Sequence, residues 1–97
     1  MAGYMIADVT VTDPEGFEEY RKLVSGTIEA YGGRYVVRGG ATETVEGDWS
    51  PSRLVVLEFD SVEQAKAWYY SEEYAGPKAM RHNTATTNAI FVEGMQG

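Results

Sequence analysis

Four side chains of this 97-residue sequence could together form a polar site for acid–base chemistry: Tyr4, Asp8, Arg38 and Glu58. A carboxylate such as Glu58 among apolar neighbours is costly to bury unless it is paired, and Arg38 is its natural partner. In such a pocket one carboxylate could be tuned for proton transfer, so Glu58, Arg38 and Asp8 are the candidate catalytic residues. The alternative is a salt bridge that only fixes the register of an interface.

The strand pattern decides whether these four side chains can meet. Residues 53–59 (Arg-Leu-Val-Val-Leu-Glu-Phe) are typical of a strand, and side chains alternate between the two faces of a strand. Phe59 directly precedes a predicted helix and is expected to pack beneath it, which places Glu58 on the opposite face. The same counting gives that face the other three candidates: Tyr4, Asp8 and Arg38.

A second group of side chains could line an apolar ligand cleft between the helices and the sheet. Trp68 and Tyr74 belong to predicted helices, and Arg81 is suited to anchor a carboxylate or a phosphate. The alternative is that the aromatic residues are simply core and that Arg81 interacts with carbonyl groups at a helix end. The candidate ligand-binding residues are therefore Tyr4, Arg38, Glu58, Trp68, Tyr74 and Arg81.

The residue types argue against a cofactor or a metal. The sequence has no cysteine, which excludes disulfides and thiolate ligands, and His82 is its one histidine. A lone histidine could be a base or a haem ligand, but such a residue is more often an exposed, solvated side chain. The glycine pairs 32–33 and 39–40 match neither a dinucleotide fingerprint nor a phosphate-binding loop. We expect no cofactor and no metal.

Length and charge narrow the class of protein. The chain carries 15 acidic residues against 8 Lys and Arg, for a formal net charge of -7. Its length fits one domain, residues 1–97. The acidic balance argues against nucleic acid and anionic membranes as partners, no segment approaches the ~20 apolar residues of a membrane span, and the N-terminus lacks the pattern of a signal peptide. We expect a cytoplasmic protein.

The elements predicted along the chain give the order β-α-β followed by β-α-β. Asp13 and Pro14 begin a helix that ends at Gly32, Ser61 caps a second helix, and Ser71 caps a further short one. Strands are expected at residues 4–11, 34–38, 53–59 and 88–93. This order predicts an α+β protein with the ferredoxin-like βαββαβ fold, in which an antiparallel four-stranded sheet carries its two main helices on one face.

Three segments fit this pattern less regularly. The dipeptide Gly76-Pro77 is expected to kink or interrupt the last helix, because proline lacks the backbone N–H and clashes with the preceding turn. Residues 41–45 could continue the second strand beyond a bend at the glycines 39–40. Residues 94–97 form a tail.

The strands are apolar on both faces, although the helices can cover only one. The run Leu54-Val55-Val56-Leu57 is the clearest case. A bare second face would be an apolar patch of several hundred Å², which monomers rarely tolerate. We therefore expect a two-fold homodimer that packs sheet against sheet. The alternative is a monomer with an exposed apolar face.

Several segments resemble a known family: GGRYVVRGG at residues 32–40, VEGDW at residues 45–49, and VVLEF at residues 55–59 followed by YYSEEY at residues 69–74. Over essentially its whole length the chain resembles the DUF1330 family, small bacterial proteins of unknown function in the dimeric α/β-barrel superfamily. The resemblance implies the ferredoxin-like fold and the face-to-face dimer, and it implies no particular reaction.

Two functions of different classes fit these observations. The first is a homodimeric α/β barrel that binds or transforms a small organic, anionic molecule without a cofactor. The second is a non-catalytic dimeric structural or binding module, in which the same polar residues only specify assembly.

Overall fold

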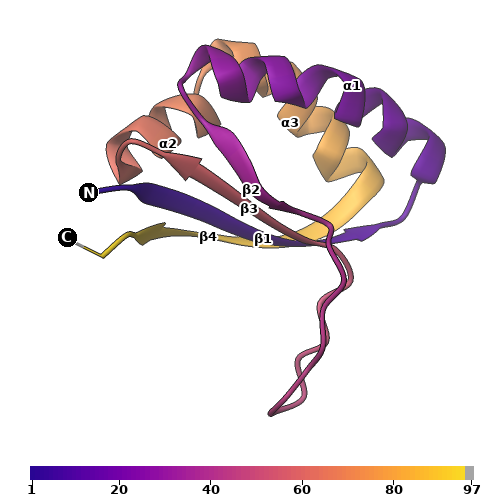
Figure 1. The fold of residues 1–97 in the computed structure, drawn as a ribbon. Coiled ribbons are helices and arrows are strands. Elements are labelled where there is room, and N and C mark those ends of the chain that lie inside the picture. The colour runs from indigo at the N-terminus through magenta and orange to yellow at the C-terminus, as the bar shows by residue number, and fades with distance from the viewer. Residues whose placement is uncertain (96–97) are drawn as a thin grey trace.

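Four strands and three helices make up the protein, and the computed structural model describes residues 1–95 of it. The sheet has the order β2-β3-β1-β4 with every neighbouring pair antiparallel, and the helices lie on one face of it (Figure 1). This is the predicted α+β, ferredoxin-like fold. The elements are β1 (Gly3–Val11), α1 (Pro14–Ala30), β2 (Arg34–Arg38), β3 (Leu54–Phe59), α2 (Val62–Tyr69), α3 (Glu72–Thr84) and β4 (Ala85–Glu93).

Helix α1 begins and ends where the local sequence predicts. The Asp13 side chain accepts a hydrogen bond from the Gly16 amide, and Pro14 occupies the first helical position, where a missing N–H does no harm. At the other end Gly32 takes a positive φ of 75°, which glycine adopts without penalty. One face of the helix is buried, through Phe17, Tyr20, Val24 and Ile28.

Helix α3 runs continuously through Pro77, so the helix is not interrupted there as the sequence allowed. Pro77 lies in the second turn, where it removes only the backbone hydrogen bond to the carbonyl of Glu73. Because Glu73 is exposed, water can supply the missing donor. The cap is as predicted: the Ser71 hydroxyl accepts a hydrogen bond from the Tyr74 amide at 3.1 Å.

The segment between β2 and β3 is an extended loop. The predicted continuation of the strand over residues 41–45 is wrong, because these residues pair with no strand and are fully exposed. Residues 40–52, which we call the arm, project away from the sheet on the side opposite the helices (Figure 1). Strand β4 starts directly at the end of α3, three residues before the predicted start. Of the predicted tail, residues 96 and 97 lie outside the described residues.

The two faces of the sheet differ in what covers them. The face toward the helices carries buried side chains such as Met5, Leu57 and Phe59. The other, which we call the outer face, is covered by no element among residues 1–95 and is largely apolar. It is formed by Tyr4, Ile6, Asp8, Arg34, Val37, Leu54, Val56, Glu58, Asn88, Ile90 and Val92.

None of the helices within residues 1–95 combines the length and the apolar character needed to cross a membrane.

Candidate functional site: an arginine-lined cavity

A β-bulge in β2 decides on which face of the sheet Arg38 lies. Arg34 pairs with Glu58 and Tyr35 with Leu57, but the next pair is Val37 with Val56. Val36 is therefore an extra residue, and a bulge of this kind reverses the alternation of side chains beyond it. As a result Arg38 lies on the helix-covered face, and the prediction that it shares a face with Glu58 is wrong.

The carboxylate of Glu58 has a different partner from the one expected. On the outer face it accepts hydrogen bonds from the Arg34 guanidinium and, at 3.0 Å, from the Tyr4 hydroxyl. The hydrogen bond to Glu58 raises the pKa of the Tyr4 hydroxyl. Glu58 is thus paired as predicted, with Tyr4 in the group, but its cation is Arg34.

Asp8 lies on the outer face but does not join this group. Its carboxylate accepts hydrogen bonds from the Trp49 indole N–H at 2.9 Å and from the Ser52 amide at 2.9 Å. The hydrogen bond from Trp49 is the main reason that the pKa of Asp8 is lowered. Asp8 therefore fastens the arm to the sheet.

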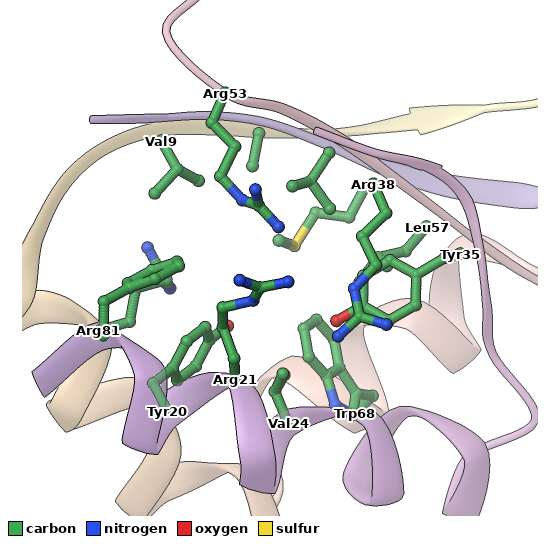
Figure 2. A pocket seen from close by; sticks show the side chains of 14 residues that line it. Val9, Tyr20, Arg21, Val24, Tyr35, Arg38, Arg53, Leu57, Trp68 and Arg81 are labelled. Atoms are coloured by element: carbon green, nitrogen blue, oxygen red, sulfur yellow. The ribbon is translucent and has the colours of Figure 1, made fainter. Parts of the chain in front are cut away.

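On the other side of the sheet, a cavity lies between the helices and strands β1 to β3 (Figure 2). Four of the five arginines of the sequence line it: Arg21 from α1, Arg38 at the end of β2, Arg53 before β3 and Arg81 from α3. The remaining lining residues carry no charge: Met5, Ala7, Val9, Phe17, Tyr20, Val24, Tyr35, Val55, Leu57 and Trp68. Within the described chain, the lining thus holds four cations and no acid.

Arg81 forms the buried end of the cavity. Its side chain is only 4% exposed, and its Nε–H donates to the Tyr74 hydroxyl at 3.2 Å, which in turn shares a hydrogen bond of 3.0 Å with Tyr20. Its Nη2 is buried and has no hydrogen-bond partner within residues 1–95. A buried guanidinium nitrogen without an acceptor is costly, so this end of the cavity is suited to an anion.

Arg21, Arg38 and Arg53 lie nearer to the solvent. Arg53 is half-buried, 6.0 Å from the Phe17 ring, and Arg38 lies 4.5 Å from the Tyr35 ring. Burial, followed by the charges of Arg21 and Arg38, lowers the pKa of Arg53. Within residues 1–95, one ion pair involves these three arginines: the exposed Glu18 binds Arg21 at 2.9 Å.

The cavity offers hydrogen-bond donors and apolar surface. Burial raises the pKa of Tyr20 far above its usual range, so its hydroxyl is neutral and can donate. Trp68 is fully buried and uses its indole N–H on the Thr27 hydroxyl at 3.0 Å, which leaves its ring as an apolar wall. No carboxylate or imidazole is among the described lining residues. Such a site can hold an anion and has no side chain suited to remove a proton from it.

The six predicted ligand-binding residues fall on both sides of the sheet. Arg38, Trp68 and Arg81 line the cavity, and Tyr74 lies behind it in contact with Arg81. Tyr4 and Glu58 lie on the outer face, so the six do not form one site. His82 is exposed and is not among the lining residues.

Arg21, Arg53 and Tyr20 were not among the predicted site residues. Arg21 carried a signal that could have been used, since it lies four residues after Phe17 and three before Val24 on the apolar face of α1. A charged residue in an apolar stripe is a candidate for a buried role. No local sequence pattern identifies Arg53 as a site residue, because its position depends on how β3 begins beneath α1.

The family described as "Domain of unknown function (DUF1330)" matches residues 2–95. The chain belongs to the DUF1330 family. Its fold is shared by several solved structures. This DUF1330 chain superimposes with a TM-score of 0.77 on a protein of unknown function from Rhodopseudomonas palustris, with 16% identity over 99% of this chain and 84% of that chain.

Two further structures share the fold at lower similarity. SnoaB, a cofactor-independent oxygenase from Streptomyces nogalater, has a TM-score of 0.65 and 11% identity over 99% of this chain and 95% of that chain. A protein from Mycobacterium tuberculosis has a TM-score of 0.58 and 17% identity over 100% of this chain and 98% of that chain. No curated protein matches the chain. At such identities the similarity establishes the fold.

Proposed function

We propose that this DUF1330 protein binds a small organic anion in the arginine-lined cavity. The observation that carries the proposal is the convergence of four guanidinium groups on a cavity whose described lining contains no acid, with Nη2 of the buried Arg81 left without a partner. Like charges held together in a protein interior destabilise it, whereas the same charges stabilise a bound anion. The arrangement is therefore suited to a ligand and poorly suited to a core.

The size of the cavity sets how a ligand would enter. The cavity has a free volume of about 40 Å³, which is room for one carboxylate group. Arg38 is exposed and the Arg21 side chain is 39% exposed, so both can swing outward to admit the rest of the molecule. Binding is then accompanied by closure of these two side chains over the ligand.

The donors in the cavity favour binding, or a reaction that needs no protein base. Tyr20 and the guanidinium groups can stabilise negative charge on an oxygen atom, but they do not accept a proton at neutral pH. The similarity to SnoaB, a cofactor-independent oxygenase, supports the idea that a small organic molecule occupies this fold without a cofactor. The composition of the chain is compatible with a cytoplasmic protein that meets small metabolic anions.

A thermal-unfolding assay with matched ligand pairs tests the proposal. Hexanoate and benzoate would be compared with hexanamide and benzamide, which have the same shape and no charge. A ligand at a hundred times its Kd stabilises a protein by about 2.7 kcal/mol. We expect stabilisation by the carboxylates only.

Two variants locate the effect. Arg53→Met keeps the apolar stem and removes the charge, and it should weaken the response. Lys22→Met removes a charge from the exposed side of α1, next to Arg21, and should leave the response intact. Equal responses to acid and amide, or an unchanged response in Arg53→Met, would overturn the proposal.

We also propose that the protein is a homodimer through the outer face of its sheet. Ile6, Ile90 and Val92 lie side by side there, and Ile90 is 59% exposed in one chain. The charged groups of this face are already satisfied, because Glu58 is paired with Arg34 and Asp8 is bonded to the arm. Two chains of net charge -7 can therefore meet at this face without placing unpaired like charges in contact.

The arm supports the same arrangement. It extends beyond the outer face (Figure 1), and Trp49 and Val45 on it are 60% and 88% exposed. A second chain packed on the outer face would lie beside the arm and could cover both side chains. In this arrangement the group of Arg34, Glu58 and Tyr4 fixes the register of the interface. This is the structural role that the sequence offered as the alternative for Glu58.

A further inference from the structure

We infer that the cavity has two separate anion subsites and that its ligand is a small organic dianion, with an acidic group at each end of a short apolar body. This inference rests on the proposed function, because it specifies the chemistry of the anion bound in the same cavity. It follows from the positions of the four guanidinium groups, from their partners, and from the apolar lining of the cavity around them.

The inner subsite is formed by Arg81 with Tyr20. Nε of Arg81 is used on the Tyr74 hydroxyl, so Nη2 is the nitrogen left for a ligand. Tyr74 has a single hydroxyl proton and can give it to Tyr20, 3.0 Å away, which frees the Tyr20 proton for the cavity. One carboxylate could then accept a hydrogen bond from each of Arg81 and Tyr20.

The outer subsite is formed by Arg21, Arg38 and Arg53, which come from three different elements. After burial, the charges of Arg21 and Arg38 lower the pKa of Arg53, whereas Tyr74, Tyr20 and Tyr69 act against burial and raise the pKa of Arg81. Figure 2 shows Arg81 and Arg38 on opposite sides of the cavity, with Arg21 and Arg53 between them. The four cations therefore do not form one cluster around a single point.

Charge balance favours two negative groups over one. Glu18 engages Arg21 from the solvent side, and within residues 1–95 no ion pair joins Arg38, Arg53 or Arg81 to an acid. A monoanion would compensate one of these charges. A dianion would compensate one at each subsite, and charge-assisted hydrogen bonds to guanidinium groups are among the stronger ones in proteins.

Apart from the arginines and the hydroxyl groups of Tyr20 and Tyr35, the lining of the cavity is apolar. Val24 from α1, Leu57 from β3 and the ring of Trp68 from α2 belong to it. A ligand that spans the cavity is therefore expected to have a hydrocarbon body, which these side chains can cover. Straight-chain dicarboxylates have this design and differ from one another only in length.

Isothermal titration calorimetry with a series of acids tests the inference at 0.15 M ionic strength. The probes are succinate, adipate and suberate, each compared with the monocarboxylate of equal length: butyrate, hexanoate and octanoate. We expect one dicarboxylate to bind at least about tenfold tighter than its partner, which corresponds to about 1.4 kcal/mol. This comparison needs only the wild-type protein and no variant.

Variants then assign the subsites. Arg81→Met should lower the affinity for the preferred dicarboxylate to that for its monocarboxylate, while the monocarboxylate still binds the outer subsite. Tyr20→Phe removes one donor with little change in shape and should reduce the same preference if Arg81→Met does not fold. Lys22→Met serves again as the control.

The possible failures are distinguishable. Equal affinities for dicarboxylates and monocarboxylates would overturn the two-subsite inference and leave the proposed anion binding in place. A preference for dicarboxylates that survives in Arg81→Met would overturn the assignment of the inner subsite. Absence of binding by every acid would overturn the inference together with the proposed function.

Discussion

Arg53 shows at the level of one residue why we propose a ligand for the cavity. It is half-buried, the charges of Arg21 and Arg38 act on it, and it forms no ion pair within residues 1–95. Groups arranged for binding commonly reduce the stability of the unliganded protein. A residue that served the fold alone would be expected to have a counter-charge, as Arg34 has in Glu58.

The Arg53→Met variant should therefore be more stable than the wild type in the absence of ligand. We expect its free energy of unfolding to rise by about 1 kcal/mol, within the range usual for relief of functional strain, because repulsion is removed while the apolar stem is kept. Urea denaturation followed by circular dichroism measures this. A clear loss of stability would mean that Arg53 is structural.

Asp8 offers a prediction about pH. The hydrogen bond from Trp49 lowers the pKa of Asp8 in the folded protein, so this carboxylate contributes stability above its unfolded pKa of about 3.9 and loses the contribution as pH falls through the lower folded value. The indole N–H signal of Trp49 in a nitrogen–proton NMR spectrum should therefore move in acid below about pH 4.

The second tryptophan is the control for that titration. Trp68 donates to Thr27 and not to an acid, so its indole signal should stay in place while the fold persists. In Asp8→Asn the movement of the Trp49 signal should vanish. A Trp49 signal that titrates in the variant as it does in the wild type would contradict the anchoring of the arm by Asp8.

At the level of elements, the faces on which side chains lie are predictable from the sequence in β1 and β3 but not in β2. Alternation along β1 and β3 correctly predicts that Tyr4, Asp8 and Glu58 lie on the outer face, because both strands pair regularly. In β2 the same rule fails for Arg38. The bulge falls within two identical valines, 36 and 37, and no glycine or proline there signals it.

The helices were predictable for a local reason. Asp13, Ser61 and Ser71 each cap a helix through a hydrogen bond to an amide three residues later, so their role is visible in a short window of sequence. The cavity is different. Arg21 and Arg53 come together only because α1 lies over the start of β3, and no local pattern encodes that contact.

Deleting one of the two valines of β2 tests the account of the bulge. With the extra residue removed, Arg34 still pairs with Glu58 and Arg38 still pairs with Val55, so Arg38 should continue to face the cavity. We expect carboxylate binding within about threefold of wild type, measured by calorimetry.

An inserted alanine between Val37 and Arg38 provides the opposite case. The inserted residue moves Arg38 one position along the strand, which turns its side chain to the outer face. Carboxylate binding should then weaken as much as in the Arg38→Met variant, which lacks the guanidinium group. A deletion variant that binds as weakly as Arg38→Met would show that the bulge positions Arg38 in some other way.

At the level of the whole molecule, the net charge of the chain is negative, whereas the charge around the cavity is positive. The chain has a net charge of -7, yet four of its five arginines surround one cavity. The composition of the whole chain therefore bears on large anionic partners and says little about a small anion. The acidic residues lie mostly on the exposed surface, for example Glu18 and Glu19 on α1.

The dimer is tested by a pair of substitutions at exposed apolar residues. Ile90→Glu places a charge on the outer face and should convert a particle of twice 10.7 kDa into one of 10.7 kDa. Leu23→Glu places the same charge on the exposed side of α1, where Leu23 is 50% exposed, and should leave the dimer intact. Light scattering coupled to size-exclusion chromatography gives both masses, and a wild-type monomer at micromolar concentration would contradict the dimer.

The most direct test of the anion site follows the guanidinium groups themselves. In a nitrogen–proton NMR titration with adipate, the Nε–H signals of the four cavity arginines (Arg21, Arg38, Arg53 and Arg81) should shift together and saturate with one Kd. Arg34, on the other side of the sheet, should not follow that curve. If no signal moves, or if all five drift in proportion to ionic strength as they do with sodium chloride, the cavity is not an anion site.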